Sequence, residues 1–192
     1  MSSRENVEIY DFFYTSILRA SEKWVIRHKG TKYERMVKVN PELSDEEKTK
    51  AINTIFDTLS FEDKNAIRIR IHHRKFMNQA VWKGTDKKKI LKQFETAWTR
   101  MYYPKNIAIA IPWFYDIPPY ITDGKATMAI NKDDFGGKKY IVTALNKSGI
   151  YYRCQLKKHL SLGWRYLWTI PGIGNYAKQI ILTAIDHGLL NW

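Results

Sequence analysis

The sequence has only one cysteine, Cys154, among its 192 residues. A lone thiol cannot build a disulfide framework or a cysteine-based zinc site within one chain. Long apolar runs are missing too, because the longest nearly uncharged and apolar stretch, residues 107–115, is far shorter than the roughly 20 residues that a membrane-spanning helix needs. The first residues include Glu5, Glu8 and Asp11, where a secretory signal would be basic and then apolar. We therefore expect a cytoplasmic protein with no membrane partner.

Acidic residues are also scarce. The chain has 19 Asp and Glu against 32 Lys and Arg, which gives a formal net charge of +13. Residues 64–100 contain 11 basic and two acidic residues, and residues 135–185 contain eight basic and no acidic ones, whereas the first 63 residues are slightly acidic. The two basic blocks predict a polyanionic partner, with nucleic acid as the default. The alternative is two ordinary solvated helix faces.

Apolar residues make up 44% of the chain, which excludes intrinsic disorder, and their spacing predicts a mainly α fold. Four helices are expected in the first half: residues 5–28, residues 45–56 behind a capping box at 44–47, residues 61–77 behind a start signal at Ser60, and residues 85–103. We expect Gly30 to end the first of these helices and Pro104 to end the last.

Residues 104–124 combine four prolines with several aromatic residues. This composition is too apolar for a flexible linker, so we expect an extended connector that packs on the rest of the chain. The alternative is that Trp113, Phe114, Tyr115 and Tyr120 stack on unpaired bases.

The most specific motif is the turn Pro171-Gly172-Ile173-Gly174. An apolar helix is expected to end at Ile170, and a second one to follow the turn. Glycines at such a turn permit positive φ and let the backbone N–H groups of a helix N-terminus approach a phosphate. The alternative is an ordinary hairpin of two helices with a glycine turn.

This turn resembles the helix-hairpin-helix motif of DNA-binding and DNA-repair proteins, whose core is hydrophobic-Pro-Gly-hydrophobic-Gly. Residues 144–150, followed by Gln155 and Leu156, read as helix, Gly-Ile turn and helix, and residues 187–190 read His-Gly-Leu-Leu. The block from about 139 to 190 is therefore similar to the C-terminal domain of the bacterial RNA polymerase alpha subunit. That family is a compact module of four to five helices that grips the DNA backbone and minor groove.

The resemblance implies a set of residues at the DNA phosphates, flanked by two upstream basic residues. The phosphate contacts would be Gly172, Gly174, Asn175, Tyr176 and Lys178, and the flanking residues Lys147 and Arg153. Lys178 departs from the family, which usually has an apolar residue there, so the side chain either points inward or shifts the contact.

Residues 76–94 in the first basic block resemble the helix-turn-helix of sigma-factor region four and of phage transcriptional regulators. Ala80, Gly84 and Ile90 match its small, turn and core positions, although Gln79 and Lys83 stand where apolar residues are usual. The resemblance implies phosphate contacts from Lys87, Lys88, Lys89 and Lys92, and a base contact from Gln93. The alternative is a basic helix pair that packs through Trp82, Phe94 and Trp98.

No pattern in the sequence predicts catalysis. Asp133 and Asp134 are adjacent, so their side chains diverge, and neither His72 nor His73 has an i+4 partner for a metal. The glycine turn also resembles the turn of DNA glycosylases. A lyase-type glycosylase, however, has Lys at the position where this chain has Tyr176. We therefore expect no catalytic residues, no metal and no cofactor.

These observations predict three parts. Residues 1–103 would be a helical, helix-turn-helix-like domain, residues 104–137 the connector, and residues 138–192 a small helix-hairpin-helix domain. The expected function is non-catalytic binding of double-stranded DNA by a bacterial or phage transcriptional regulator associated with the nucleoid. The alternative is a phage-type interaction protein that modulates RNA polymerase or a CRISPR nuclease. Binding of RNA or single strands, and a homodimer through the first helix, remain open.

Overall fold

The structure, a computed structural model, describes residues 3–27, 43–71, 85–116 and 124–191. Within these ranges the chain forms eight α-helices and two short 3₁₀ helices, and its only strand-like pairing is an isolated antiparallel bridge between Ala129 and Tyr152. The predicted mainly α fold is confirmed. None of the described helices is long and apolar enough to cross a membrane. The end of the first helix at Gly30 and the proposed helix-turn-helix turn lie outside the described residues.

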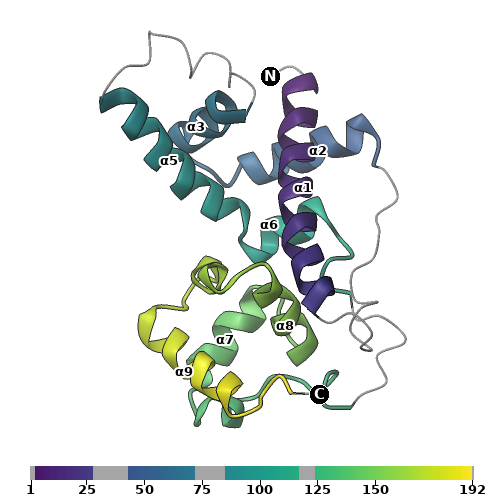
Figure 1. Cartoon of the computed structure of the whole chain (residues 1–192), viewed down its shortest axis with the longest axis vertical. Helices are drawn as coiled ribbons and strands as arrows, with labels where there is room; N and C mark the ends of the chain where they lie inside the picture. The colour runs from purple at the N-terminus through teal and green to yellow at the C-terminus, as the bar shows by residue number, and fades with distance from the viewer. Residues whose placement is uncertain (1–2, 28–42, 72–84, 117–123, 192) are drawn as a thin grey trace.

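Five helices make up the N-terminal region. They are α1 (Ser3–Arg27), α2 (Asp45–Phe56), α3 (Phe61–Ile71), α5 (Thr85–Met101) and α6 (Pro104–Ala110). The long helix α1 packs across α2, and α3 packs against α5 (Figure 1). Ile9, Phe13 and Ile17 are buried on α1. Their spacing of four residues puts them on one helix face, as the apolar periodicity predicted.

Two predicted helix starts are confirmed in detail. Before α2, the Ser44 hydroxyl accepts from the Glu47 N–H at 3.2 Å, and the Glu47 carboxylate accepts from the Ser44 N–H at 2.8 Å. The bonds that the Glu47 carboxylate accepts from the Ser44 N–H and, at 3.0 Å, from the Ser44 hydroxyl lower the pKa of Glu47. Before α3, the Ser60 hydroxyl accepts from the Asp63 N–H at 3.2 Å. Residues 61–71 of the helix predicted over 61–77 are helical, and the predicted continuation to 77 lies outside the described residues.

The prediction for residues 104–124 is partly wrong. Pro104 follows the end of α5, but it also opens α6 as that helix's first residue. Proline suits this position because its fixed φ is helical and its missing N–H would have no partner there. The predicted packing is confirmed: the Tyr10 hydroxyl donates to the Ala110 carbonyl at 2.8 Å, and Phe114 and Tyr115 are buried. Tyr120 lies outside the described residues.

The C-terminal region is built from shorter elements. They are η2 (Lys132–Phe135), α7 (Lys139–Lys147), α8 (Arg153–Ser161), η3 (Trp164–Thr169) and α9 (Asn175–Asp186), which lie together below the N-terminal helices in Figure 1. The predicted order of helix, Gly-Ile turn and helix is confirmed in α7 and α8. The apolar segment that ends at Ile170 is a 3₁₀ helix and not the expected α-helix.

The two regions share one continuous hydrophobic core. Tyr102, at the end of α5, stacks on Tyr166 of η3 with ring centroids 4.0 Å apart, and the Thr169 hydroxyl lies 3.0 Å from the Tyr102 carbonyl. We call the contacts of Tyr102, Tyr166, Thr169 and His159 at the boundary between the two regions the joint. The split into separate domains remains a prediction, and the structure supplies a packed boundary between the regions.

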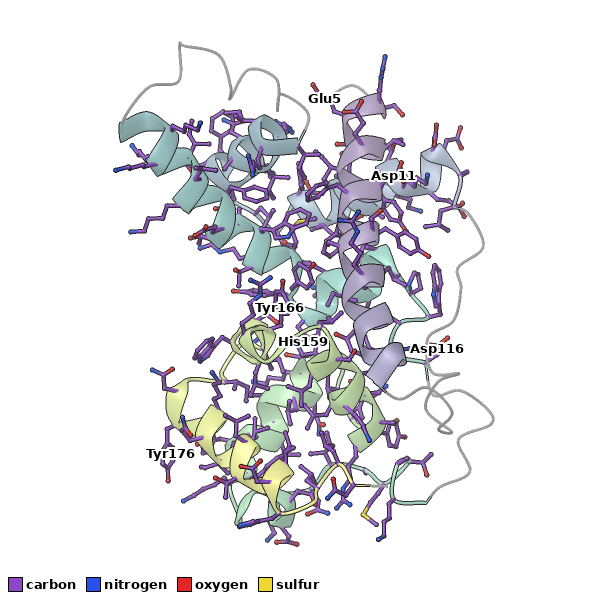
Figure 2. All side chains as sticks on the ribbon, in the orientation of Figure 1. Glu5, Asp11, Asp116, His159, Tyr166 and Tyr176 are labelled. Atoms are coloured by element: carbon purple, nitrogen blue, oxygen red, sulfur yellow. The ribbon has the colours of Figure 1, made fainter. Side chains whose placement is uncertain are left out.

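His159 is the buried polar centre of the joint, close to Tyr166 (Figure 2). Its Nε2 lies 3.0 Å from the Tyr166 carbonyl, which only accepts, so Nε2 carries the proton and donates. Nδ1 then accepts from the Tyr115 hydroxyl at 2.7 Å. Burial lowers the pKa of His159 to about 4, although the bond to the Tyr166 carbonyl acts in the opposite direction. The joint therefore holds a neutral imidazole at physiological pH.

Candidate nucleic-acid interface

The glycine turn before α9 has two glycines with different structural reasons. Gly172 has φ +89°, and a Cβ there would lie 3.2 Å from the Cβ of Ala144 on α7. Both facts make glycine necessary for the fold at this position. Gly174 has φ −85°, and no atom lies within 4 Å of where its Cβ would be. Neither φ nor lack of space therefore requires glycine at 174, although glycine is a favoured N-cap residue, and the space in front of it is open.

The N-terminus of α9 has no side-chain cap, because its N-cap residue is Gly174. The first hydrogen bond that closes a helical turn runs from the Lys178 N–H to the Gly174 carbonyl at 2.9 Å. The N–H groups of Asn175, Tyr176 and Ala177 precede it and have no partner within the helix. Asn175 and Tyr176 are exposed. These donors lie at the positive end of the helix dipole, which is an arrangement suited to anionic oxygens.

Lys178 lies on the outer side of the hairpin, against Trp168. Its Nζ is 3.4 Å from the centre of the Trp168 ring, and the indole Nε1–H donates to the Asn175 side-chain oxygen at 3.1 Å. The side chain therefore does not point inward as an apolar residue would, and a shifted phosphate contact stays a prediction. The sequence interpretation missed Trp168. A Trp ten residues before a Lys gave no signal, because η3 and the turn between them determine how the chain folds back.

The two upstream basic residues differ. Lys147 is exposed at the end of α7, one helical turn beyond Ala144, which contacts the glycine turn. Arg153 instead donates to the Asp134 carboxylate at 2.6 Å, and both side chains are mostly buried. Its charge is compensated within the fold. The geometry therefore favours Lys147 as a flanking residue of the turn and gives Arg153 a structural task.

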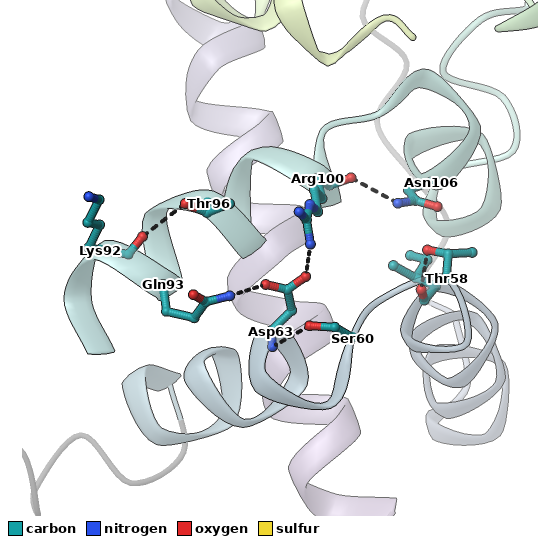
Figure 3. Close-up of polar contacts among 9 residues, drawn as sticks. Thr58, Ser60, Asp63, Lys92, Gln93, Thr96, Arg100 and Asn106 are labelled. Carbon is teal, nitrogen blue, oxygen red and sulfur yellow. Dashed lines mark hydrogen bonds and ion pairs between the residues drawn. The ribbon is translucent and has the colours of Figure 1, made fainter. Parts of the chain in front are cut away.

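The predicted base-reading residue on α5 is turned inward. The Gln93 amide donates to the buried Asp63 carboxylate at 2.5 Å, and Arg100 forms an ion pair with the other oxygen of Asp63 (Figure 3). Gln93 therefore joins α5 to α3, and its amide is committed to a partner that sequence spacing did not show. Lys88, Lys89 and Lys92 are exposed on α5, and Lys87 is half-buried. The turn of the proposed helix-turn-helix, residues 76–84, lies outside the described residues.

The described residues contain no group of three or more His, Cys, Asp or Glu side chains placed to hold a metal ion. Cys154 is buried, and burial raises the pKa of its thiol. No protein-family model, curated protein or solved structure is significantly similar to the chain.

Proposed function

We propose that this chain is a non-catalytic protein that binds double-stranded DNA through the hairpin formed by η3, the glycine turn and α9. The bacterial or phage transcriptional regulator of the sequence prediction remains the biological role that we propose. The observation that best supports this proposal is the N-terminus of α9, which is exposed and has no side-chain cap. Its N-cap residue is Gly174, where neither φ nor lack of space requires glycine. Three backbone N–H groups in one helical turn are a suitable receptor for the phosphate of a DNA strand.

The charges around this turn support the same proposal. Residues 135–185 contain no acidic side chain, so a phosphate at the turn meets no carboxylate from this part of the chain. Lys178 lies within the first turn of α9. Lys147 is exposed on α7, one helical turn after Ala144, the residue next to Gly172. Each lysine adds attraction by releasing counterions from the DNA. Contacts of this kind position the protein on DNA and do not read sequence.

The exposed lysines of α5 add a second, weaker surface to the proposal. Lys88, Lys89 and Lys92 suit phosphates, but no described base-reading side chain accompanies them, because Gln93 is bonded to Asp63. We therefore propose that sequence preference arises from DNA shape rather than from base contacts by α5.

A salt titration tests the electrostatic part. Fluorescence anisotropy with a blunt labelled duplex would measure the dissociation constant from low to moderate salt. One phosphate neutralised by each of Lys147 and Lys178 predicts an affinity loss of about 12-fold from these two residues when monovalent salt rises fourfold. An affinity that does not change with salt would contradict the proposal.

Two matched glycine substitutions test the turn. Gly174→Val leaves the fold intact, because φ is ordinary and the space is open, but it places methyl groups in front of the α9 N–H donors. Gly124→Val is the control, because Gly124 also has open space and no positive φ and lies far along the chain from the hairpin. We expect about a tenfold loss of duplex affinity for Gly174→Val, the size of one or two lost phosphate contacts, and none for Gly124→Val. Equal affinities of the two folded variants would exclude the turn as the contact.

A further inference from the structure

Two large aromatic side chains are exposed at the hairpin. Trp168, in η3, is 48% exposed, and Tyr176, the second residue of α9, is 67% exposed. Figure 2 shows Tyr176 on the outer side of α9. Trp168 donates to Asn175, the residue before Tyr176, so both rings belong to the surroundings of the first turn of α9. Both rings therefore adjoin the N–H groups to which we assign a phosphate.

The Trp168 ring is exposed and yet held in place. Leu167 and Thr169 on either side of it are fully buried, which fixes the backbone of η3. The bond from the indole to Asn175 and the ammonium of Lys178 over the ring orient the side chain. Because the ammonium covers one face of the indole, a stacked base would meet the opposite face, which the same contacts hold in a fixed orientation.

The surroundings of the two rings favour one class of ligand. A ligand that fits must be flat and apolar where it meets the rings and negatively charged where it meets the turn. No acidic residue lies between positions 135 and 185, and Asp186 stands at the other end of α9, roughly 16 Å away along the helix axis. The other carboxylates near α9 are Asp133 and Asp134 of η2, which packs against it, and Asp134 is paired with Arg153. Nucleotides whose bases are not paired have both properties. The bases of an intact duplex do not, because they are stacked inside it.

We propose that Trp168 and Tyr176 form a stacking surface for unpaired bases, so that the preferred ligand of the hairpin is duplex DNA that continues into a single strand. This inference rests on the proposed function, because the backbone phosphates at α9 place the strand beside the rings. It adds the class of DNA structure that the site selects. The protein would hold the duplex end at the turn and stack the first unpaired bases on the two rings.

The test compares three labelled DNAs with the full-length protein: a blunt duplex, the same duplex with a single-stranded tail, and the tail alone. We expect the wild-type protein to bind the tailed duplex about tenfold more tightly than the blunt one, the gain of about one stacked base. A fluorescent adenine analogue at the first unpaired position reports stacking directly, because its emission falls when a ring covers it.

The variants separate the rings from the turn. Trp168→Leu and Tyr176→Leu are each expected to lower the preference for the tail, which is the ratio of tailed-duplex affinity to blunt-duplex affinity, about five- to tenfold. Tyr176→Phe keeps the ring and should keep the preference. Tyr151→Leu is the matched control, because Tyr151 is 50% exposed and belongs to the turn before α8. Circular dichroism verifies that each variant folds.

Each outcome has a clear meaning. Equal binding of blunt and tailed duplex by the wild-type protein would overturn the stacking surface and leave the proposed duplex binding in place. The same holds if the Leu variants keep the full preference and the full change in fluorescence, as would occur if the rings instead serve a protein partner. If the wild-type protein binds none of the three DNAs, both proposals are wrong.

Discussion

The two basic regions of the chain have similar charge but use it differently. On the face of α5 that meets α3, Gln93 and Arg100 both turn to the buried carboxylate of Asp63. At the hairpin, Lys178 contacts an aromatic ring, and the donors at the start of α9 have no partner within the helix. The comparison teaches that charge density does not identify a binding surface. The position of the carboxylates decides which polar groups the fold itself uses.

The largest expected effect concerns the buried carboxylate of Asp63 in the N-terminal region. Asp63→Ala removes a fully buried carboxylate and leaves the Gln93 amide and the Arg100 guanidinium without this acceptor. We expect the free energy of unfolding, measured by urea denaturation, to fall by about 3 kcal/mol, at the lower end for a broken buried ion pair because Arg100 still reaches solvent. Glu95→Ala removes an exposed carboxylate of α5, the helix that carries Gln93 and Arg100, and should cost less than about 0.5 kcal/mol. Equal losses would show that Asp63 does not join α3 to α5.

The next effect concerns the joint between the regions. The folded protein depresses the pKa of His159 to about 4 from an ordinary 6.5, so the unfolded chain binds a proton that the folded one does not. Stability is therefore greatest above pH 6.5 and falls as the pH decreases toward 4. Between pH 7.5 and pH 5 the loss from this group is about 2 kcal/mol. Denaturation at several pH values would measure it, and a His159→Gln variant that keeps the same slope would contradict the assignment.

A pair of double substitutions compares the two basic surfaces directly. Lys147→Gln with Lys178→Gln is expected to lower duplex affinity about tenfold and to reduce the salt slope by about two. Lys88→Gln with Lys89→Gln on α5 removes the same charge and should have a smaller effect on both. Anisotropy at two salt concentrations measures each. If the α5 pair has the larger effect, the ranking of the two surfaces is reversed.

The smallest effect is at Gly174, where one substitution is expected to raise stability and to lower DNA affinity. Gly174→Ser gives α9 the side-chain cap that it lacks, so the free energy of unfolding should rise by about 0.3 kcal/mol. The same hydroxyl occupies an N–H group that we assign to a phosphate, so duplex affinity should fall. Thermal denaturation and anisotropy on one protein sample measure both, with Gly124→Ser as the control. A variant that gains both stability and affinity would contradict a phosphate at this turn.

Local signals predicted most of the helices correctly. The capping box at Ser44 and Glu47 lies within four residues, and its hydrogen bonds depend on nothing distant. The apolar spacing of α1 and the turn before α9 are equally local. Pro104 shows the limit of this reasoning, because proline both ends one helix and suits the first position of the next. The sequence pattern did not separate these two roles.

The site was less predictable because its decisive contacts are between residues far apart. Gln93 suits a base edge by chemistry, but its partner Asp63 is 30 residues away. Arg153 suits a phosphate, but its guanidinium is paired with the carboxylate of Asp134, which lies 19 residues upstream. Trp168 reaches Asn175 and Lys178 only because a 3₁₀ helix and a glycine turn fold back on α9. Residue type gave the chemistry, and tertiary packing selected which residues remain available.

The stacking of Tyr102 on Tyr166 also has a thermodynamic consequence. Because the core continues through this contact, opening either region exposes apolar surface of the other, and the two are expected to unfold in a single cooperative transition. Calorimetric and van't Hoff enthalpies that agree would verify it. A destabilising change in α1 or α3 then lowers the population of intact hairpins without touching the hairpin itself. Binding and unfolding become linked equilibria of one body.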